Sequence, residues 1–170
     1  MFETFGVNEI ERLTSPNGRV TAVTSKQGAA VKHLEFDGHR VIDVPMPTTD
    51  FSFAGSTLAP WPNRLDGARW QLDGREFQGE LTEPWNGNNL HGLLVRRDFE
   101  IAEQTSDAIT YRYLFGADPV YPFEVEVTTR YRLLDDEMIC TLAATNHGDE
   151  VAPIGLGSHP YFNLDEASAI

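Results

Sequence analysis

The chain has 170 residues, of which 41% are hydrophobic and 23% are charged, as is usual for a globular protein. Its formal net charge of −13 argues against nucleic acid and anionic membrane surfaces as partners, because both repel an acidic protein. The single cysteine excludes an internal disulfide bond, and its apolar neighbours predict a core position for Cys140. The N-terminus lacks a secretory signal pattern and no apolar run is long enough to span a membrane, so we expect a cytoplasmic protein.

The first half of the sequence alternates between apolar and polar residues, which predicts β-strands. The strands expected here cover residues 20–25, 29–36 and 40–44. Prolines and threonines at 45–49 and small residues and prolines at 55–62 predict loops. Residues 68–77 form the clearest hairpin signal, because Asp73-Gly74 separates two alternating runs.

The second half continues the same pattern after a long irregular loop predicted at residues 80–89. Further strands are expected at residues 98–104, 108–115, 123–133, 138–145 and 151–156. Phe123 to Leu133 alternates most strictly, so its odd-numbered residues should face the core. No window predicts a helix. The sequence therefore favours one all-β, antiparallel sandwich or barrel domain over residues 1–170.

Three polar segments with aromatic residues stand out against this β scaffold. They are Trp61-Pro62-Asn63-Arg64-Leu65, Asn88-Asn89-Leu90-His91-Gly92 and Gly157-Ser158-His159-Pro160-Tyr161-Phe162-Asn163-Leu164. The guanidinium of Arg64 has several donors in a fixed plane, and Trp61, Trp85 and Tyr161 offer flat apolar faces. Because sugars present hydroxyls around a partly apolar ring, we expect the three segments to converge on one sugar site.

The five histidines are not equivalent as candidates for chemistry. His39 and His147 follow turn signals, and His33 lies within a predicted strand. Only His91 and His159 lie in segments with other recognition residues, and an imidazole is a suitable proton donor near neutral pH.

Other chemistries find little support in the sequence. His91 and His159 lack short metal-ligand spacing and an obvious third ligand, so a metal site is disfavoured. The nucleophile motif Gly-x-Ser-x-Gly and glycine-rich phosphate loops do not occur either.

Taken in order, these segments resemble the aldose 1-epimerase (galactose mutarotase-like) family. The resemblance includes Pro62-Asn63-Arg64-Leu65, Asn89-Leu90-His91-Gly92, Tyr121-Pro122 and His159-Pro160-Tyr161-Phe162-Asn163-Leu164, and it covers most of the chain from about Ala54. It implies an antiparallel β-supersandwich, of which residues 1–170 would be the N-terminal portion. It also implies interconversion of the α and β anomers of a free hexose such as galactose or glucose, without a cofactor.

The resemblance also implies roles for individual residues. His159 would be the general acid that protonates the ring oxygen, and His91 would be its catalytic companion, binding and polarising the sugar with Arg64. Asn63, Trp61, Trp85 and Tyr161 are expected to complete the substrate contacts. The family's general base, a glutamate, is expected beyond residue 170, so the chain by itself is expected to lack it.

Departures from the family pattern leave alternatives open. Gly157-Ser158 replaces a common Thr-Asn pair, and Leu93 stands where a second glycine is common, which leaves the preferred sugar undecided. Arg96 and Arg97 could meet a phosphorylated or otherwise anionic hexose, although a solvated strand start is the simpler interpretation. A non-catalytic carbohydrate-binding module is the alternative if the chain is naturally this short. Exposed strand edges would then also favour a homodimer.

Overall fold

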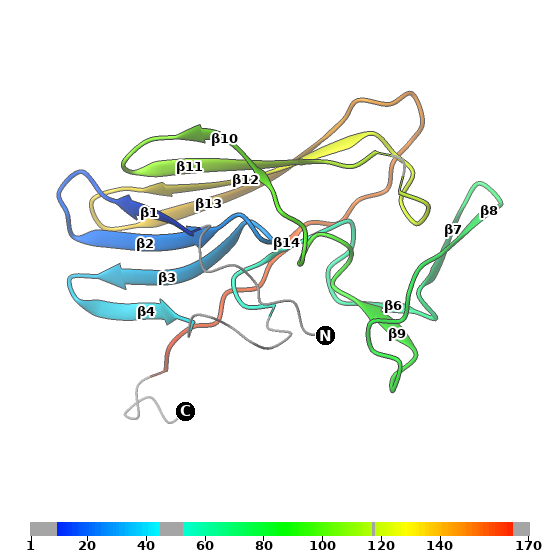
Figure 1. Cartoon of the computed structure of the whole chain (residues 1–170), viewed down its shortest axis with the longest axis horizontal. Coiled ribbons are helices and arrows are strands. Elements are labelled where there is room, and N and C mark those ends of the chain that lie inside the picture. The colour runs from blue at the N-terminus through cyan, green and yellow to red at the C-terminus, as the bar shows by residue number, and fades with distance from the viewer. Residues whose placement is uncertain (1–9, 45–52, 117, 165–170) are drawn as a thin grey trace.

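The computed structural model describes residues 10–44, 53–116 and 118–164 and confirms the all-β prediction. Within these residues the strands form two four-stranded antiparallel sheets and three two-stranded antiparallel ladders (Figure 1). The two large sheets occupy one end of the molecule, and the ladders β6–β9 and β7–β8 lie at the other (Figure 1).

Each large sheet is a meander in which consecutive strands pair. The first sheet contains β1 (Ile10–Thr14), β2 (Val20–Ser25), β3 (Ala30–Phe36) and β4 (His39–Asp43). The second contains β10 (Glu100–Gln104), β11 (Ala108–Leu114), β12 (Val125–Leu133) and β13 (Met138–Asn146). The ladders pair β14 (Gly157–Ser158) with β5 (Thr57–Leu58), β6 (Arg64–Asp66) with β9 (Asn88–Leu90), and β7 (Arg69–Leu72) with β8 (Arg75–Gln78).

The alternation in the sequence determines which face of β12 enters the core. Its odd-numbered residues, from Val125 to Leu133, are all buried, and the even-numbered residues between them are half-buried or exposed. The predicted hairpin is also confirmed, because Asp73 and Gly74 join β7 to β8 with φ values of 49° and 78°. Positive φ at both central residues matches the twist that a two-residue hairpin requires.

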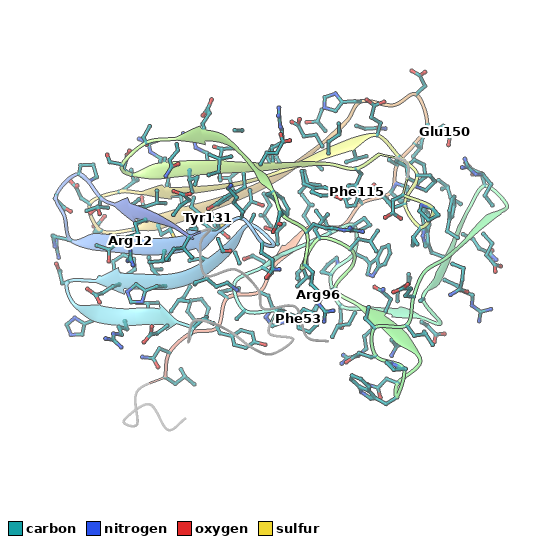
Figure 2. All side chains as sticks on the ribbon, in the orientation of Figure 1. Arg12, Phe53, Arg96, Phe115, Tyr131 and Glu150 are labelled. Carbon is teal, nitrogen blue, oxygen red and sulfur yellow. The ribbon has the colours of Figure 1, made fainter. Side chains whose placement is uncertain are left out.

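Buried polar contacts join the two large sheets face to face. The hydroxyl of Tyr131 on β12 donates to the carbonyl oxygen of Ala29 at 2.8 Å, just before β3 (Figure 2). Thr24 Oγ1 on β2 lies 2.7 Å from the hydroxyl oxygen of Tyr111 on β11. Since all four residues are buried, these bonds fix the relative position of the sheets inside an otherwise apolar core.

Two parts of the chain differ from the strand predictions. Strand β1 was not predicted, because Leu13 is its only buried residue and its alternation is therefore weak. Residues 151–156 form no strand although they are largely apolar. Pro153 lacks the donor that a ladder needs, and the backbone N–H of Gly155 instead donates to the carbonyl oxygen of Pro60 at 2.7 Å.

The core position predicted for Cys140 is wrong. Cys140 is exposed, as are most residues of β13, the last strand of its sheet, which has no pairing strand beyond it among the described residues. The loop predicted at residues 45–49 lies outside the described residues. Nowhere in the described ranges is there a helix long and apolar enough to cross a membrane.

Candidate functional site

The first histidine of the site, His159, follows the two-residue strand β14. That strand pairs with β5, which places Gly157 opposite Leu58 and Ser158 opposite Thr57. The backbone N–H of His159 donates to the carbonyl oxygen of Ser56 at 3.1 Å, and its carbonyl oxygen accepts from the N–H of Gly55 at 2.7 Å. His159 therefore lies at a strand end, and the two main-chain hydrogen bonds fix the backbone position from which its ring extends.

His91 follows strand β9 and is held by the loop that contains Asn63. The backbone N–H of His91 donates to the carbonyl oxygen of Asn63 at 2.9 Å. In return, the backbone N–H of Asn63 donates to His91 Nδ1 at 3.1 Å. Because Nδ1 accepts this bond, the neutral ring must carry its hydrogen on Nε2. His91 therefore presents an N–H donor to whatever occupies the site.

Although 68 positions separate them in sequence (159 − 91), the two imidazole rings lie side by side. Their centroids are 4.9 Å apart and their planes meet at 83°, an edge-to-face contact. Phe53 packs edge-on against His91 at 4.7 Å, and Tyr161 lies 5.2 Å from His159. The two histidine segments therefore converge, as the sequence predicted, within a cluster of aromatic rings.

Arg64 is the cationic member of this region and belongs to β6, which pairs with β9. Its Nε donates to Glu83 Oε2 at 2.7 Å and its Nη2 donates to Glu83 Oε1 at 3.0 Å. These hydrogen bonds, and then the charge of Glu83, raise the pKa of Arg64 above its usual value. Of the five guanidinium N–H groups, two are occupied by this contact and three face elsewhere.

Burial is the main cause that lowers the pKa of His91 below its usual value. The charges of His159 and Arg64 lower it further, whereas the charge of Glu83 raises it. Protonation at Nδ1 would also direct an N–H at the N–H of Asn63, which opposes the charged form. His91 is therefore suited to donate a hydrogen bond as a neutral group.

The two tryptophans predicted as sugar platforms have different environments. The indole N–H of Trp61 donates to Asn89 Oδ1 at 3.1 Å, and Asn89 is buried. Trp61 is thus half-buried and fixed. Trp85 is 75% exposed and extends from the loop between β8 and β9. Only Trp85 offers a largely uncovered ring face.

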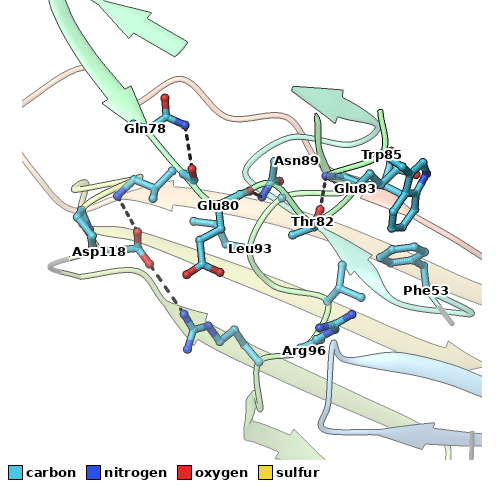
Figure 3. Close-up of a pocket in the computed structure, with 17 residues that line it drawn as sticks. Phe53, Gln78, Glu80, Thr82, Glu83, Trp85, Asn89, Leu93, Arg96 and Asp118 are labelled. Carbon is cyan, nitrogen blue, oxygen red and sulfur yellow. Dashed lines mark hydrogen bonds and ion pairs between the residues drawn. The ribbon is translucent and has the colours of Figure 1, made fainter. Parts of the chain in front are cut away.

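A cavity of about 900 Å³ has Leu90 and Gly92, the chain neighbours of His91, in its lining (Figure 3). Phe53, Glu83 and Trp85 lie at one end of its wall and Asp118 at the other, where Arg97 lies 4.0 Å from the Asp118 carboxylate (Figure 3). Neither histidine belongs to its lining, but Phe53 contacts His91 and also forms part of the wall. The site is therefore a polar cluster at the margin of a larger hollow, whose lining carries both acidic and basic groups.

Sequence reasoning missed Phe53 and Glu83. Neither lies in a recognisable motif, and Glu83 falls inside a stretch that was expected to be irregular. Glu83 could have been identified as a partner of Arg64 only from the pairing of β6 with β9, because this pairing brings the loop before β9 beside Arg64. The described residues contain no group of three histidine, cysteine or acidic side chains close enough to hold a metal ion.

Known proteins resemble the chain both in sequence and in fold. The chain is 32% identical over 143 residues to the uncharacterized protein YihR of Escherichia coli K12, an alignment that covers 83% of this chain and 46% of YihR. The GalM/aldose epimerase homologue of C. elegans superimposes with a TM-score of 0.78 at 21% identity, covering 92% of this chain and 51% of that one. A galactose mutarotase-like protein of Clostridium acetobutylicum gives a TM-score of 0.78 at 20% identity, with coverages of 91% and 50%.

These likenesses confirm the antiparallel β-supersandwich predicted from the resemblance. The chain spans about half the length of the relatives and solved structures that it matches. The family model for aldose 1-epimerase matches residues 11–170, which is nearly the whole sequence. The chain therefore belongs to the aldose 1-epimerase family.

Proposed function

We propose that this chain carries the sugar-recognition part of a mutarotase, which in the complete protein interconverts the α and β anomers of a free hexose. One observation carries the proposal: His91 and His159, from distant segments, lie with ring centroids 4.9 Å apart. Family membership supports a sugar epimerase of the isomerase type. The choice of galactose or glucose as substrate, and a cytoplasmic location, are parts of the proposal.

In the proposed reaction, His159 donates a proton to the ring oxygen while a carboxylate of the complete protein removes the proton of the anomeric hydroxyl. The bond between C1 and the ring oxygen breaks and leaves an open-chain aldehyde. Rotation about C1–C2 then allows the ring to close on the other face, with the proton transfers reversed. One acid and one base suffice, and no electrons are exchanged with a cofactor.

The other residues have supporting roles in the proposal. His91 donates from Nε2 to a sugar oxygen, because its Nδ1 already accepts from Asn63. Arg64 offers its remaining N–H groups to hydroxyls, and Tyr161 beside His159 limits the position of the sugar ring. Trp85 provides a ring face for the apolar side of the pyranose.

Anomer exchange of galactose and glucose, followed by NMR or polarimetry with the complete protein, tests the proposal. The variant His159→Ala should lose about 10²- to 10⁴-fold in rate, the usual contribution of a general acid. The matched control is His147→Ala, because His147 is exposed and its backbone N–H, which donates to the carbonyl oxygen of Glu124 at 2.8 Å, is kept in the variant. An unchanged rate in His159→Ala would contradict the assignment. Sugar binding without exchange would instead indicate a non-catalytic module.

A second candidate is an epimerase for a phosphorylated or otherwise anionic hexose. Arg96 and Phe53 line the same end of the cavity, so a charged substituent on a sugar at the histidine pair would lie toward Arg96 (Figures 2 and 3). Against it, Glu80 also lines the cavity, and Arg97 lies 4.0 Å from the carboxylate of Asp118. Exchange rates measured on glucose and on glucose 6-phosphate separate the two candidates. If the substrate is an anionic hexose, Arg96→Ala should slow exchange of glucose 6-phosphate. If the substrate is a free hexose, Arg96→Ala should have no effect.

A further inference from the structure

Glu83 is unusual among the acidic residues of this chain. It is 8% exposed and is the one carboxylate that is buried in the described ranges. Glutamate is rarely buried unless it is paired, and here both carboxylate oxygens accept from Arg64. The two parallel N–H···O bonds form the most specific contact that an arginine and a carboxylate can make.

The backbone around Glu83 is as firmly held as its side chain. Its N–H donates to the carbonyl oxygen of Asn88 at 2.9 Å, and its own carbonyl oxygen accepts from Asn88 at 3.2 Å and from Asn86 at 3.0 Å. The preceding residue, Thr82, accepts at Oγ1 from the N–H of Leu90 at 2.8 Å. These bonds attach Glu83 to β9, the strand that ends directly before His91.

We propose that Glu83 is a positioning residue, which holds the Arg64 guanidinium in one orientation so that its remaining N–H groups face the sugar. This inference rests on the proposed function, in which Arg64 contacts substrate. The Arg64 side chain is half exposed, so without a buried partner it would sample several rotamers. A fixed fork avoids the cost of ordering that side chain each time a sugar binds.

The pair also has an electrostatic effect on the neighbouring histidine. Arg64 lowers the pKa of His91 and Glu83 raises it, so the two partly cancel. Removing the charge of Glu83 while Arg64 stays would therefore move the pKa of His91 further down. This shift reports the charge of Glu83 itself, so the ordering of Arg64 is tested by KM and by the double variant.

The test compares Glu83→Gln, Arg64→Ala and the double variant in the complete protein by steady-state anomer exchange. Glu83→Gln should raise KM about five- to tenfold with little change in kcat, the effect expected when one long side chain loses its order. It should add nothing in the Arg64→Ala background, because Glu83 acts through Arg64. In the pH profile of the exchange rate, the acid limb that reflects protonation of His91 should move to lower pH in Glu83→Gln, because the pKa of His91 falls.

The matched control is Glu150→Gln, which removes the carboxylate from an exposed contact with Arg75 at 2.6 Å. It makes the same chemical change far from the histidines and should leave KM and the pH profile unchanged. Equal KM values for Glu83→Gln and the wild type would overturn the positioning role. So would a Glu83→Gln effect that persists without Arg64.

A second measurement separates failure of this inference from failure of the proposed function. In ¹⁵N NMR spectra without sugar, the Nε–H of Arg64 should be protected from solvent exchange in the wild type and lose that protection in Glu83→Gln. If the complete protein shows no anomer exchange, the mutarotase proposal fails, and this signal alone then decides whether Glu83 orders Arg64. A signal that is the same in both proteins would refute the ordering.

Discussion

Gly92, the residue after His91, leaves no room for a side chain. Its φ is +75°, and a Cβ atom would lie 2.3 Å from the carbonyl oxygen and 2.6 Å from the carbonyl carbon of Ala59. That oxygen also accepts from the N–H groups of Leu93 at 2.8 Å and Leu94 at 3.3 Å. Because Ala59 is fully buried, neither its segment nor the segment of Gly92 can move apart without breaking these bonds.

The variant Gly92→Ala should lower the free energy of unfolding by about 3 kcal/mol. Roughly 1 kcal/mol comes from a left-handed conformation with a Cβ, and about 1 kcal/mol from each of the two hydrogen bonds that must lengthen. The displaced loop would also move His91 away from His159, so anomer exchange should fall in the same variant.

Gly87 supplies the control, because it lies on the other side of β9 with a φ of +69° and has nothing within 4 Å of an added Cβ. Gly87→Ala should therefore cost only the conformational part, about 1 kcal/mol. Urea unfolding of both variants gives the comparison, with an unchanged slope showing that the midpoint shift reports stability. Equal losses for Gly87→Ala and Gly92→Ala would refute the steric argument.

Three further predictions follow from burial and hydrogen bonding. Burial and the charges of His159 and Arg64 lower the pKa of His91 in the folded state. Its stabilising contribution is therefore complete above the unfolded value of about 6.5 and is lost as pH falls through the folded value. In urea unfolding between neutral and mildly acidic pH, the stability of His91→Gln should decline less steeply than that of the wild type. Tyr131→Phe leaves the buried carbonyl of Ala29 without its 2.8 Å bond and should cost about 1–3 kcal/mol in the same assay. Trp85→Ala should change stability by less than about 0.5 kcal/mol, because the ring is 75% exposed, yet weaken sugar binding in a titration.

The sequence was sufficient where one residue type dictates one backbone geometry. Alternation predicted the buried face of β12, and Asp73-Gly74 predicted the hairpin. The ladders β5–β14 and β6–β9 could not be predicted, because two or three residues carry no period. Strand β5 was read as loop and β9 as part of an irregular stretch, although both position the histidines.

The sequence predicted the residues of the candidate site that lie in motifs, but not the residues that reach the site through the fold. Motifs identified Arg64, His91 and His159 as residues of three segments expected to converge, and the rings of the two histidines do lie together. Glu83 could not be found this way, because its contact with Arg64 depends on the register between β6 and β9. Phe53 likewise reaches His91 only through the path of the chain in space.

Strand β5 is the element that joins the large sheets to both histidines. The hydroxyls of Thr57 on β5 and Thr129 on β12 lie 2.7 Å apart in the core, which anchors β5 to the second sheet. On one side β5 pairs with β14, which ends directly before His159. Immediately after β5, Ala59 forms a parallel bridge with Gly92, the residue that follows His91. The distance between the imidazoles is therefore set by main-chain bonds to one short segment, residues 57–59, which is itself fixed to the core. A substitution that displaces this segment would move both histidine segments at once and separate the two rings.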